Sequence, residues 1–272
     1  MNGIPFRSLR SSAHLARRAP SATKPTFRHC NTASTPQSTT TPTTTIDLPD
    51  LSRFNKNKMP SKQINAADFP LLQTCLTDNK EWAERVSHEN PGFFANSAKG
   101  QSPFLLWIGC ADSRVPESVV LGRKPGEIFV HRNIANQFHH NDDSANAVLM
   151  YAVGNLGVQH VAVVGHTACG GCLAAHGAPK PDENATESSA LSRFLDPLIK
   201  LRHSLPEDAS IDDLIVANVK KTVKTVCESD VIQANWKKAK ETGTQPVYVH
   251  GWLKDLSTGL IKDLECSEGP DF

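Results

Sequence analysis

Residues 161–172 read Val-Ala-Val-Val-Gly-His-Thr-Ala-Cys-Gly-Gly-Cys, an apolar run followed at once by residue types that bind metals. The run from Val161 to Val164 predicts a central strand, because β-branched side chains pack well in a buried sheet. A second apolar run, from Phe104 to Ile108, ends before Gly109 and Cys110. The two runs therefore predict buried strands whose ends carry chemically active side chains.

Helical patterns alternate with these strands along the chain. The predicted helices cover 71–86, 142–156, 191–198 and 211–226, and further strands are predicted at 128–130 and 247–249. Pro197 is expected to break or restart the third helix. Strands alternating with helices predict an α/β fold with a mainly parallel β-sheet flanked by helices. The helix at 71–86 precedes the first strand and predicts an N-terminal helical arm.

Residues 1–60 differ in composition from the rest of the chain. Arginines and lysines recur there, serine is frequent, and the first acidic residue is Asp47. This composition is typical of a mitochondrial or plastid transit peptide. We expect a transit peptide and a flexible Thr/Ser/Pro-rich linker over 1–60, cleaved after Arg18 or Arg28, and the globular domain over 61–272. The expected location is the mitochondrial matrix, with the plastid or the cytoplasm as alternatives.

The overall charge and the cysteine count exclude several other classes of protein. The 272 residues include 29 Lys and Arg against 28 Asp and Glu, so nucleic acid is not an expected partner. We find no apolar window of about 18 residues that would predict a membrane span. The seven cysteines are odd in number and widely spaced. That pattern favours reduced thiols or metal ligands over a disulfide scaffold.

The polar residues after the two strands have the composition of a zinc site. His166 and Cys169 are separated by two residues, so a tight turn can direct both side chains at one point. Glycines at 165, 170 and 171 are expected to permit that turn. Cys110 is the best third ligand, because the ends of parallel strands lie at one edge of a sheet. Two thiolates and one imidazole suit one Zn²⁺ per chain and leave one coordination position open.

An acidic and a basic residue follow Cys110 on the same turn. A carboxylate at Asp112 can coordinate the metal or accept a hydrogen bond from water bound to it. The guanidinium of Arg114 can hold that carboxylate with two hydrogen bonds and keep it ionised. The sequence therefore predicts a carboxylate–guanidinium pair beside the metal.

Four stretches together resemble the β-class carbonic anhydrases. Cys-Ala-Asp-Ser-Arg-Val-Pro at 110–116 and Gly-His-Thr-Ala-Cys-Gly-Gly at 165–171 look like the two signatures of that family. Residues 125–136 resemble its third block, and Val-His-Gly-Trp at 249–252 resembles its C-terminal strand. The resemblance covers roughly residues 71–264.

The resemblance implies a lyase that hydrates CO2 reversibly to bicarbonate and a proton. It implies that Cys110, His166 and Cys169 bind the zinc and that Asp112 and Arg114 form a catalytic dyad. Zinc lowers the pKa of a bound water to about 7, so the expected nucleophile is a zinc-bound hydroxide that the dyad orients.

The resemblance also implies a substrate pocket and an assembly. Gln101, Phe129 and Tyr151 match residues that line the CO2 pocket, some of them reaching in from a partner subunit. The expected assembly is a homo-oligomer, either a dimer or a tetramer of dimers. Separately, we expect backbone N–H groups near Gly170 to stabilise the negative charge that develops on the substrate oxygen.

Four positions concern the inhibition of the enzyme by bicarbonate. Trp107, Gly109 and Arg132 resemble an inhibitory bicarbonate site that some family members carry. Those members have a tyrosine two residues after the C-terminal tryptophan, where this chain has Lys254. The chain thus departs from the regulated pattern at that position.

Three alternatives stay open from the residues alone. The same zinc site could serve a hydrolase that acts on CS2 or COS. A non-catalytic zinc protein would need a fourth ligand, for which Cys172 and Asp112 are available. Cys169 and Cys172 also have the spacing of a thiol-redox motif. The sequence does not single out a proton shuttle among His131, His139 and His140.

Overall fold

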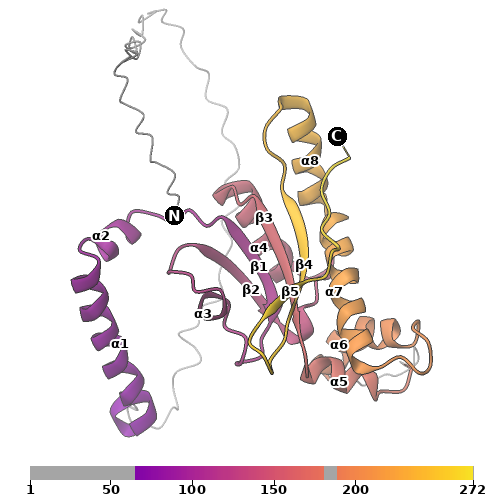
Figure 1. Ribbon diagram of the computed structural model, residues 1–272, viewed down its shortest axis with the longest axis horizontal. Coiled ribbons are helices and arrows are strands. Elements are labelled where there is room, and N and C mark those ends of the chain that lie inside the picture. Colours follow the sequence, from indigo (N-terminus) through magenta and orange to yellow (C-terminus); the bar gives the residue numbers. More distant parts are fainter. Residues whose placement is uncertain (1–64, 181–188, 272) are drawn as a thin grey trace, which may run out of the picture. The chain divides into compact units, whose positions relative to one another are not determined.

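The computed structural model describes residues 65–180 and 189–271 (Figure 1). The predicted transit peptide and linker at 1–60 lie outside the described residues. The domain boundary at 60/61 therefore stays a prediction.

A five-stranded sheet with the strand order β2-β1-β3-β4-β5 forms the centre of the domain. Its strands are β1 Leu105–Cys110, β2 Ile128–Asn133, β3 His160–His166, β4 Tyr248–Lys254 and β5 Ile261–Asp263. The first four strands pair in parallel, whereas β5 runs antiparallel to β4 and closes a hairpin. The predicted mainly parallel sheet is confirmed.

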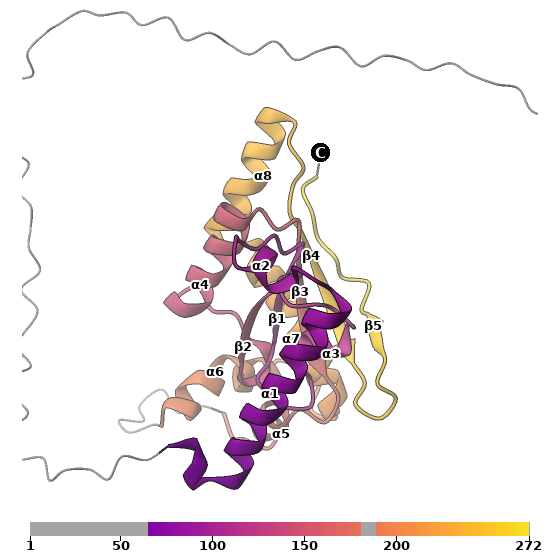
Figure 2. The ribbon, with the colours of Figure 1, turned by 90° about the vertical axis from the view of Figure 1, so that its left-hand side faces the viewer.

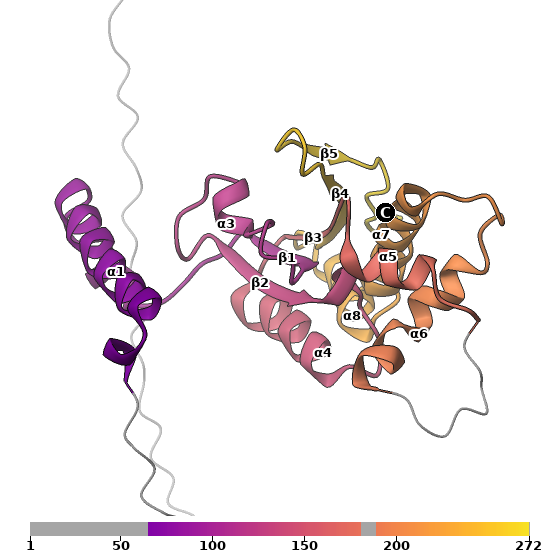
Figure 3. The ribbon, with the colours of Figure 1, turned by 90° about the horizontal axis from the view of Figure 1, so that it is seen from below.

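Helices precede β1 and lie between successive strands as far as β4 (Figures 1 and 2). They are α1 Pro70–Glu89, α2 Phe93–Ser97, α3 Glu117–Val120, α4 Asp143–Met150, α5 Gly170–His176, α6 Ala190–Arg202, α7 Ile211–Cys227 and α8 Asp230–Thr242. Short helical turns occur at Ala66–Asp68 and Ile134–Asn136, and a π-helical segment, Tyr151–Leu156, continues α4. Figure 3 shows α5, α6 and α7 gathered together beside the sheet. No helix among the described residues is long and apolar enough to cross a membrane.

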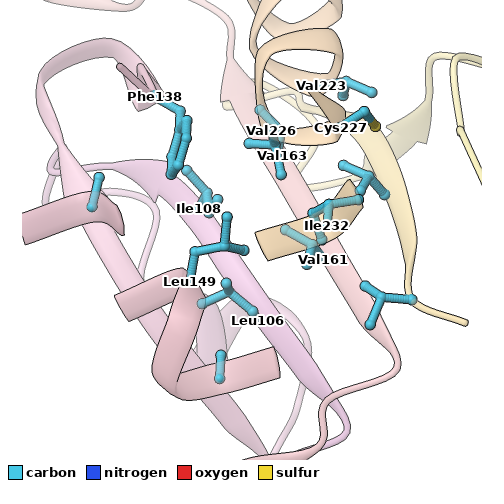
Figure 4. Close-up of a cluster of buried hydrophobic side chains, with 14 of the residues drawn as sticks. Leu106, Ile108, Phe138, Leu149, Val161, Val163, Val223, Val226, Cys227 and Ile232 are labelled. Carbon is cyan, nitrogen blue, oxygen red and sulfur yellow. The ribbon is translucent and has the colours of Figure 1, made fainter. Parts of the chain in front are cut away.

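The main core lies between the sheet and the helices α4, α7 and α8. Side chains alternate along each strand, so one face of β1 and β3 carries the residues that enter this core. The cluster includes Leu106, Ile108, Leu149, Val161, Val163, Val223, Val226 and Ile232 (Figure 4). The opposite face of the sheet carries a smaller cluster around Trp107 and Val164.

The helix α6 corrects one expectation, because Pro197 lies inside it and does not break it. An interior proline costs a helix about 3 kcal/mol. Against this, Leu195, Leu198 and Ile199 of α6 are buried in the cluster that α6 forms with α5 and α7. Each such side chain stabilises the fold by about 1.5–3 kcal/mol, so packing outweighs the proline.

The predicted N-terminal arm is present as α1 and α2. Pro70 occupies the first turn of α1, where its missing N–H costs nothing. The edge of the Trp82 ring packs against Phe94 of α2, with the ring centroids 5.6 Å apart. Neither helix has a buried residue, and Leu71 is 82% exposed.

Candidate metal centre

Two adjacent strands end at the proposed metal ligands. Cys110 is the last residue of β1 and His166 is the last residue of β3. Cys169 is the N-cap of α5, three residues further along the chain. The ligand atoms of these three side chains all lie within 4.8 Å of one another, and all three residues are buried. The sheet thus brings together the three predicted ligands.

His166 is oriented as a metal ligand. Its ring is fully buried, and Nδ1 lies 2.9 Å from the carbonyl oxygen of Thr167. A carbonyl oxygen only accepts, so Nδ1 carries the proton and Nε2 keeps a lone pair. Nε2 is buried and has no hydrogen-bond partner. A metal-binding histidine is typically held in this way, so the imidazole fits a zinc ion.

The two thiols also fit a cation. A hydrogen bond with Cys169, together with burial, raises the pKa of Cys110 to about 12. Neighbouring buried thiols hold their protons because a second negative charge would be unfavourable there. A divalent cation reverses this preference and binds the thiolates. The donor set of two sulfurs and one nitrogen is the one that zinc prefers.

The turn between His166 and Cys169 is built differently from the expectation. The residue with a left-handed backbone is Ala168, at φ 53°, while Gly165, Gly170 and Gly171 do not have positive φ. Strain of this kind is typical of functional sites held by their surroundings. Thr167 anchors the turn: its N–H donates to the carbonyl of Lys254 at 3.0 Å, and its hydroxyl accepts from the N–H of Leu256 at 3.0 Å.

Two of the three glycines, Gly165 and Gly171, serve close packing rather than the turn, whereas a Cβ at Gly170 would meet no atom within 4 Å. A Cβ at Gly165 would lie 2.6 Å from Cγ2 of Val219 on α7. A Cβ at Gly171 would lie 2.8 Å from Cγ2 of Ile134. Both distances are too short for carbon atoms, so these positions let α7 and the segment after β2 approach the metal centre.

Asp112 and Arg114 form the predicted pair. Nε of Arg114 donates to Oδ1 of Asp112 at 2.9 Å, and Nη2 donates to Oδ2 at 2.7 Å. These hydrogen bonds hold the pKa of Asp112 well below its usual range. Oδ2 of Asp112 lies 3.8 Å from Nε2 of His166. The carboxylate is thus ionised and faces the metal ligands.

Arg132 contributes a contact that the sequence did not reveal. Its Nε donates to the carbonyl of Cys110 at 2.8 Å, and its Nη2 donates to the carbonyl of Asp112 at 2.6 Å. Nη1 also lies 3.5 Å from a carboxylate oxygen of Glu117. A single guanidinium therefore fixes the backbone that carries one metal ligand and the carboxylate. From the sequence, Arg132 was recognisable only as part of the block 125–136 and of the resemblance to a bicarbonate site.

Of the residues linked to bicarbonate regulation, Gly109 pairs in register with Arg132, whereas Lys254 lies on β4, on the other side of β3. A Cβ at Gly109 would lie 2.0 Å from Nε1 of Trp107, so glycine makes room for the indole. Nε1 of Trp107 is buried without a hydrogen-bond partner. The ammonium of Lys254 is buried and donates to the carbonyl of Gly259 in the β4–β5 hairpin.

The predicted substrate residues do not all lie at the metal centre of one chain. Gly170 directly follows Cys169 and begins α5. Phe129 stacks on Tyr151 with the ring centroids 5.9 Å apart. Phe129 lies four residues along β2 from Asn133, the partner of Cys110, which corresponds to about 13 Å.

Gln101 lies before β1, at the end of the strand away from Cys110. It borders a surface hollow with Asn90, Phe93 and Pro125. Within one chain only Gly170 adjoins the metal ligands, so the roles of Gln101, Phe129 and Tyr151 stay predictions.

Comparison with known proteins identifies the family. Residues 105–261 match the family model described as carbonic anhydrase. The chain belongs to the carbonic anhydrase family. A curated carbonic anhydrase of Emericella nidulans is 39% identical over 192 residues, covering 68% of this chain and 80% of the relative. A carbonic anhydrase of Saccharomyces cerevisiae is 34% identical over 203 residues, covering 70% and 87%.

Solved structures place this carbonic anhydrase in the β class. A tetrameric β-carbonic anhydrase from Sordaria macrospora has 35% identity and a TM-score of 0.63, covering 73% of this chain and 99% of its own. The Coccomyxa β-carbonic anhydrase, solved with acetazolamide, has 30% identity and a TM-score of 0.65, covering 71% and 86%. The predicted fold, family and zinc cofactor are confirmed, and the enzyme is a lyase that hydrates CO2.

Proposed function

We propose that Asp112 and Arg114 are the catalytic pair of this carbonic anhydrase and that Cys110, His166 and Cys169 hold its zinc. The observation that carries the proposal is the clasp of Asp112 by Arg114, with Oδ2 of the carboxylate 3.8 Å from Nε2 of His166. Neither Asp112 nor Cys172 belongs to the cluster of ligand atoms among the described residues. That leaves a coordination position for water, as a catalytic site requires.

Zinc, when bound, supplies a Lewis acid that makes water acidic near neutral pH. The ionised carboxylate of Asp112 can only accept hydrogen bonds, so it accepts one from the attacking water and orients its lone pair toward CO2. Arg114 fixes the carboxylate, and its Nη2 also donates to the carbonyl of Ala168 at 3.3 Å. The pair therefore positions the nucleophile without taking up a proton itself.

The remaining substrate contacts come from α5 and from a second chain. The N–H groups at Gly170 lie at the start of α5, beside Cys169, and would donate to the developing bicarbonate oxygen. Phe129 lies too far along β2 to reach the metal ligands of its own chain, and Gln101 precedes the opposite end of β1. Tyr151 stacks on Phe129. In a homodimer, residues of a partner would complete the apolar wall of the CO2 pocket.

The proposed assembly is a homodimer, with a tetramer formed from two dimers. The similar enzymes from Sordaria macrospora are tetrameric. The arm supports the dimer, because Leu71, Leu72 and Leu76 of α1 are all more than half exposed. An apolar helix surface of this kind is typical of an interface with another chain.

The proposed location is the mitochondrial matrix. Its support is the basic, serine-rich and acid-poor composition of residues 1–46. Import of the full chain into isolated mitochondria, with protection from added protease and shortening of the chain, would support it. A chain that stays full-length and protease-sensitive would favour the cytoplasm.

Stopped-flow CO2 hydration, with zinc content measured on the same sample, tests the catalytic pair. Asp112→Asn keeps the size of the side chain but removes its charge, so activity should fall by about 10²–10³-fold with zinc retained. Asp212→Asn on the exposed first turn of α7 is the control and should leave the rate unchanged. Equal rates in both variants would remove Asp112 from the mechanism. Hydrolysis of CS2 or COS faster than CO2 hydration would favour the alternative hydrolase.

A further inference from the structure

Two histidines form a close pair on the sheet, away from the metal centre. His160 is the first residue of β3 and His250 lies on the adjacent strand β4. Nδ1 of His160 is 3.0 Å from Nε2 of His250, and the two rings are tilted by 38°. In the strand register Ala162 faces His250, so the histidines are diagonal neighbours on one face of the sheet.

The contacts of His250 use both of its ring nitrogens, and Nε2 shares a hydrogen bond with Nδ1 of His160. Nδ1 of His250 lies 2.9 Å from the hydroxyl of Ser267, in the segment after β5. When Nδ1–H donates to that hydroxyl, the lone pair of Nε2 points at His160. Burial and the neighbouring His160 lower the pKa of His250, which favours the neutral ring that binds metals.

Neighbouring aromatic rings restrict both imidazoles. Tyr248 stacks on His160 and Trp252 stacks on His250, each with ring centroids 6.2 Å apart. A carboxylate, Asp263 of β5, pairs in register with Trp252 and partly opposes the lowering of the pKa of His250, so a cation here would meet a favourable charge. The pair is thus held in one arrangement before any ligand binds.

We propose that His160 and His250 form a second metal site, which binds a divalent transition-metal ion of the Ni²⁺ or Cu²⁺ type. Two nitrogens at about 2.1 Å from one ion, at the right angle of square-planar or octahedral coordination, are about 3.0 Å apart, as these two are. The ion takes the place of the proton that the two nitrogens share, and that proton leaves to solvent, so each ring binds the ion through a lone pair. Imidazole is a preferred ligand of those ions, and water completes the coordination. Ser267 orients His250 as hydrogen-bond partners of metal-binding histidines usually do.

The site is separate from the zinc centre. His160 and His166 stand at opposite ends of β3, six residues or about 20 Å apart. Occupation of the histidine pair therefore leaves the zinc in place. A bound metal ion also links β3 and β4, and through His250 the segment after β5, so it raises the midpoint temperature of thermal unfolding.

The test uses the full-length zinc enzyme without an affinity tag. Equilibrium dialysis against Ni²⁺, with both metals measured by mass spectrometry, should show about one Ni²⁺ per chain with the zinc unchanged. His160→Gln and His250→Gln should each lower the bound Ni²⁺ by at least about tenfold. His140→Gln changes an exposed histidine elsewhere and should keep the Ni²⁺.

Nickel that fails to bind, or that binds equally well to both variants, would overturn the site. If either variant loses zinc or CO2 hydration, the proposal is tested instead by NMR on the wild-type enzyme labelled with ¹⁵N-histidine. Paramagnetic Ni²⁺ should broaden the imidazole signals of His160 and His250 before those of the other histidines. Earlier broadening of any other pair would equally reject the proposal.

Discussion

The metal centre and the N-terminal arm differ in whether a single chain buries their side chains. At the metal centre, β1, β3 and α5 bury Cys110, His166 and Cys169 within a single chain. In the arm, α1 and α2 carry leucines and phenylalanines, yet no residue of either helix is buried. The zinc-binding half of the site is therefore complete in one chain, whereas the arm has an apolar surface that one chain leaves uncovered.

The largest expected effect is at the metal centre. His166→Ala removes the imidazole whose Nε2 has no other partner, so zinc should be lost and CO2 hydration should fall by more than about 10³-fold. Zinc content and stopped-flow rate measure both losses. His203→Gln, whose Nε2 contacts a carbonyl near the protein surface, is the control. Full activity in the zinc-free variant would mean that catalysis does not depend on this site.

The next largest effect is expected at the proposed catalytic pair, and it can be measured while the metal ligands stay unchanged. Arg114 lowers the pKa of Asp112 in the folded protein, so the ionised pair contributes its full stability above the unfolded pKa of about 3.9. That contribution is lost as the pH falls from there through the lower folded pKa. Arg114→Gln should raise that pKa and reduce activity by about 10–100-fold at neutral pH, with zinc retained.

The pH–rate profile of Arg114→Gln supplies a second check. Burial of the carboxyl then acts without the guanidinium, so activity should fall at a higher pH than in the wild type as the solution is acidified. If activity falls at the same pH in both proteins, protonation of Asp112 is not the cause of the loss of activity in acid.

A smaller effect tests the close packing around the centre. Gly165→Ala places a methyl group 2.6 Å from Cγ2 of Val219, which should destabilise the fold by about 1–3 kcal/mol in urea unfolding. Adding Val219→Ala should recover part of that loss, because it removes the colliding methyl group. Strictly additive losses in the double variant would contradict the packing explanation.

The smallest effect on the zinc centre is expected from the arm. Leu72→Glu adds a charge to the apolar side of α1, so sedimentation should show a smaller assembly while zinc content is unchanged. Gln73→Glu adds the same charge one residue further round the helix and should leave the assembly intact. If Leu72→Glu stays fully assembled, the arm does not form the interface.

The sequence predicted the parts that depend on local pattern. The β-branched run before His166 and the apolar run before Cys110 predicted two buried strands, and the three ligands predicted at and after their ends come together in one cluster. Asp112 and Arg114 were also predictable, because two residues on one turn can reach each other without help from the rest of the fold. The helix from 142 to 156 ends before Gly157, as its pattern indicated.

Only the tertiary structure decided the contacts between distant segments. The left-handed residue is Ala168 rather than a glycine, because Thr167 is anchored to the end of β4 and to Leu256. Arg132 holds the loop after β1, because the sheet order places β2 next to β1.

The same reason explains two further features that could not be predicted from the sequence. Pro197 stays inside α6 because its neighbours are buried, and His160 meets His250 because β3 and β4 are adjacent although 90 positions separate the two residues. Local spacing fixes which side chains a strand or turn offers. The order of strands and the packing of helices fix which of them meet, because those contacts depend on the whole buried surface of the domain.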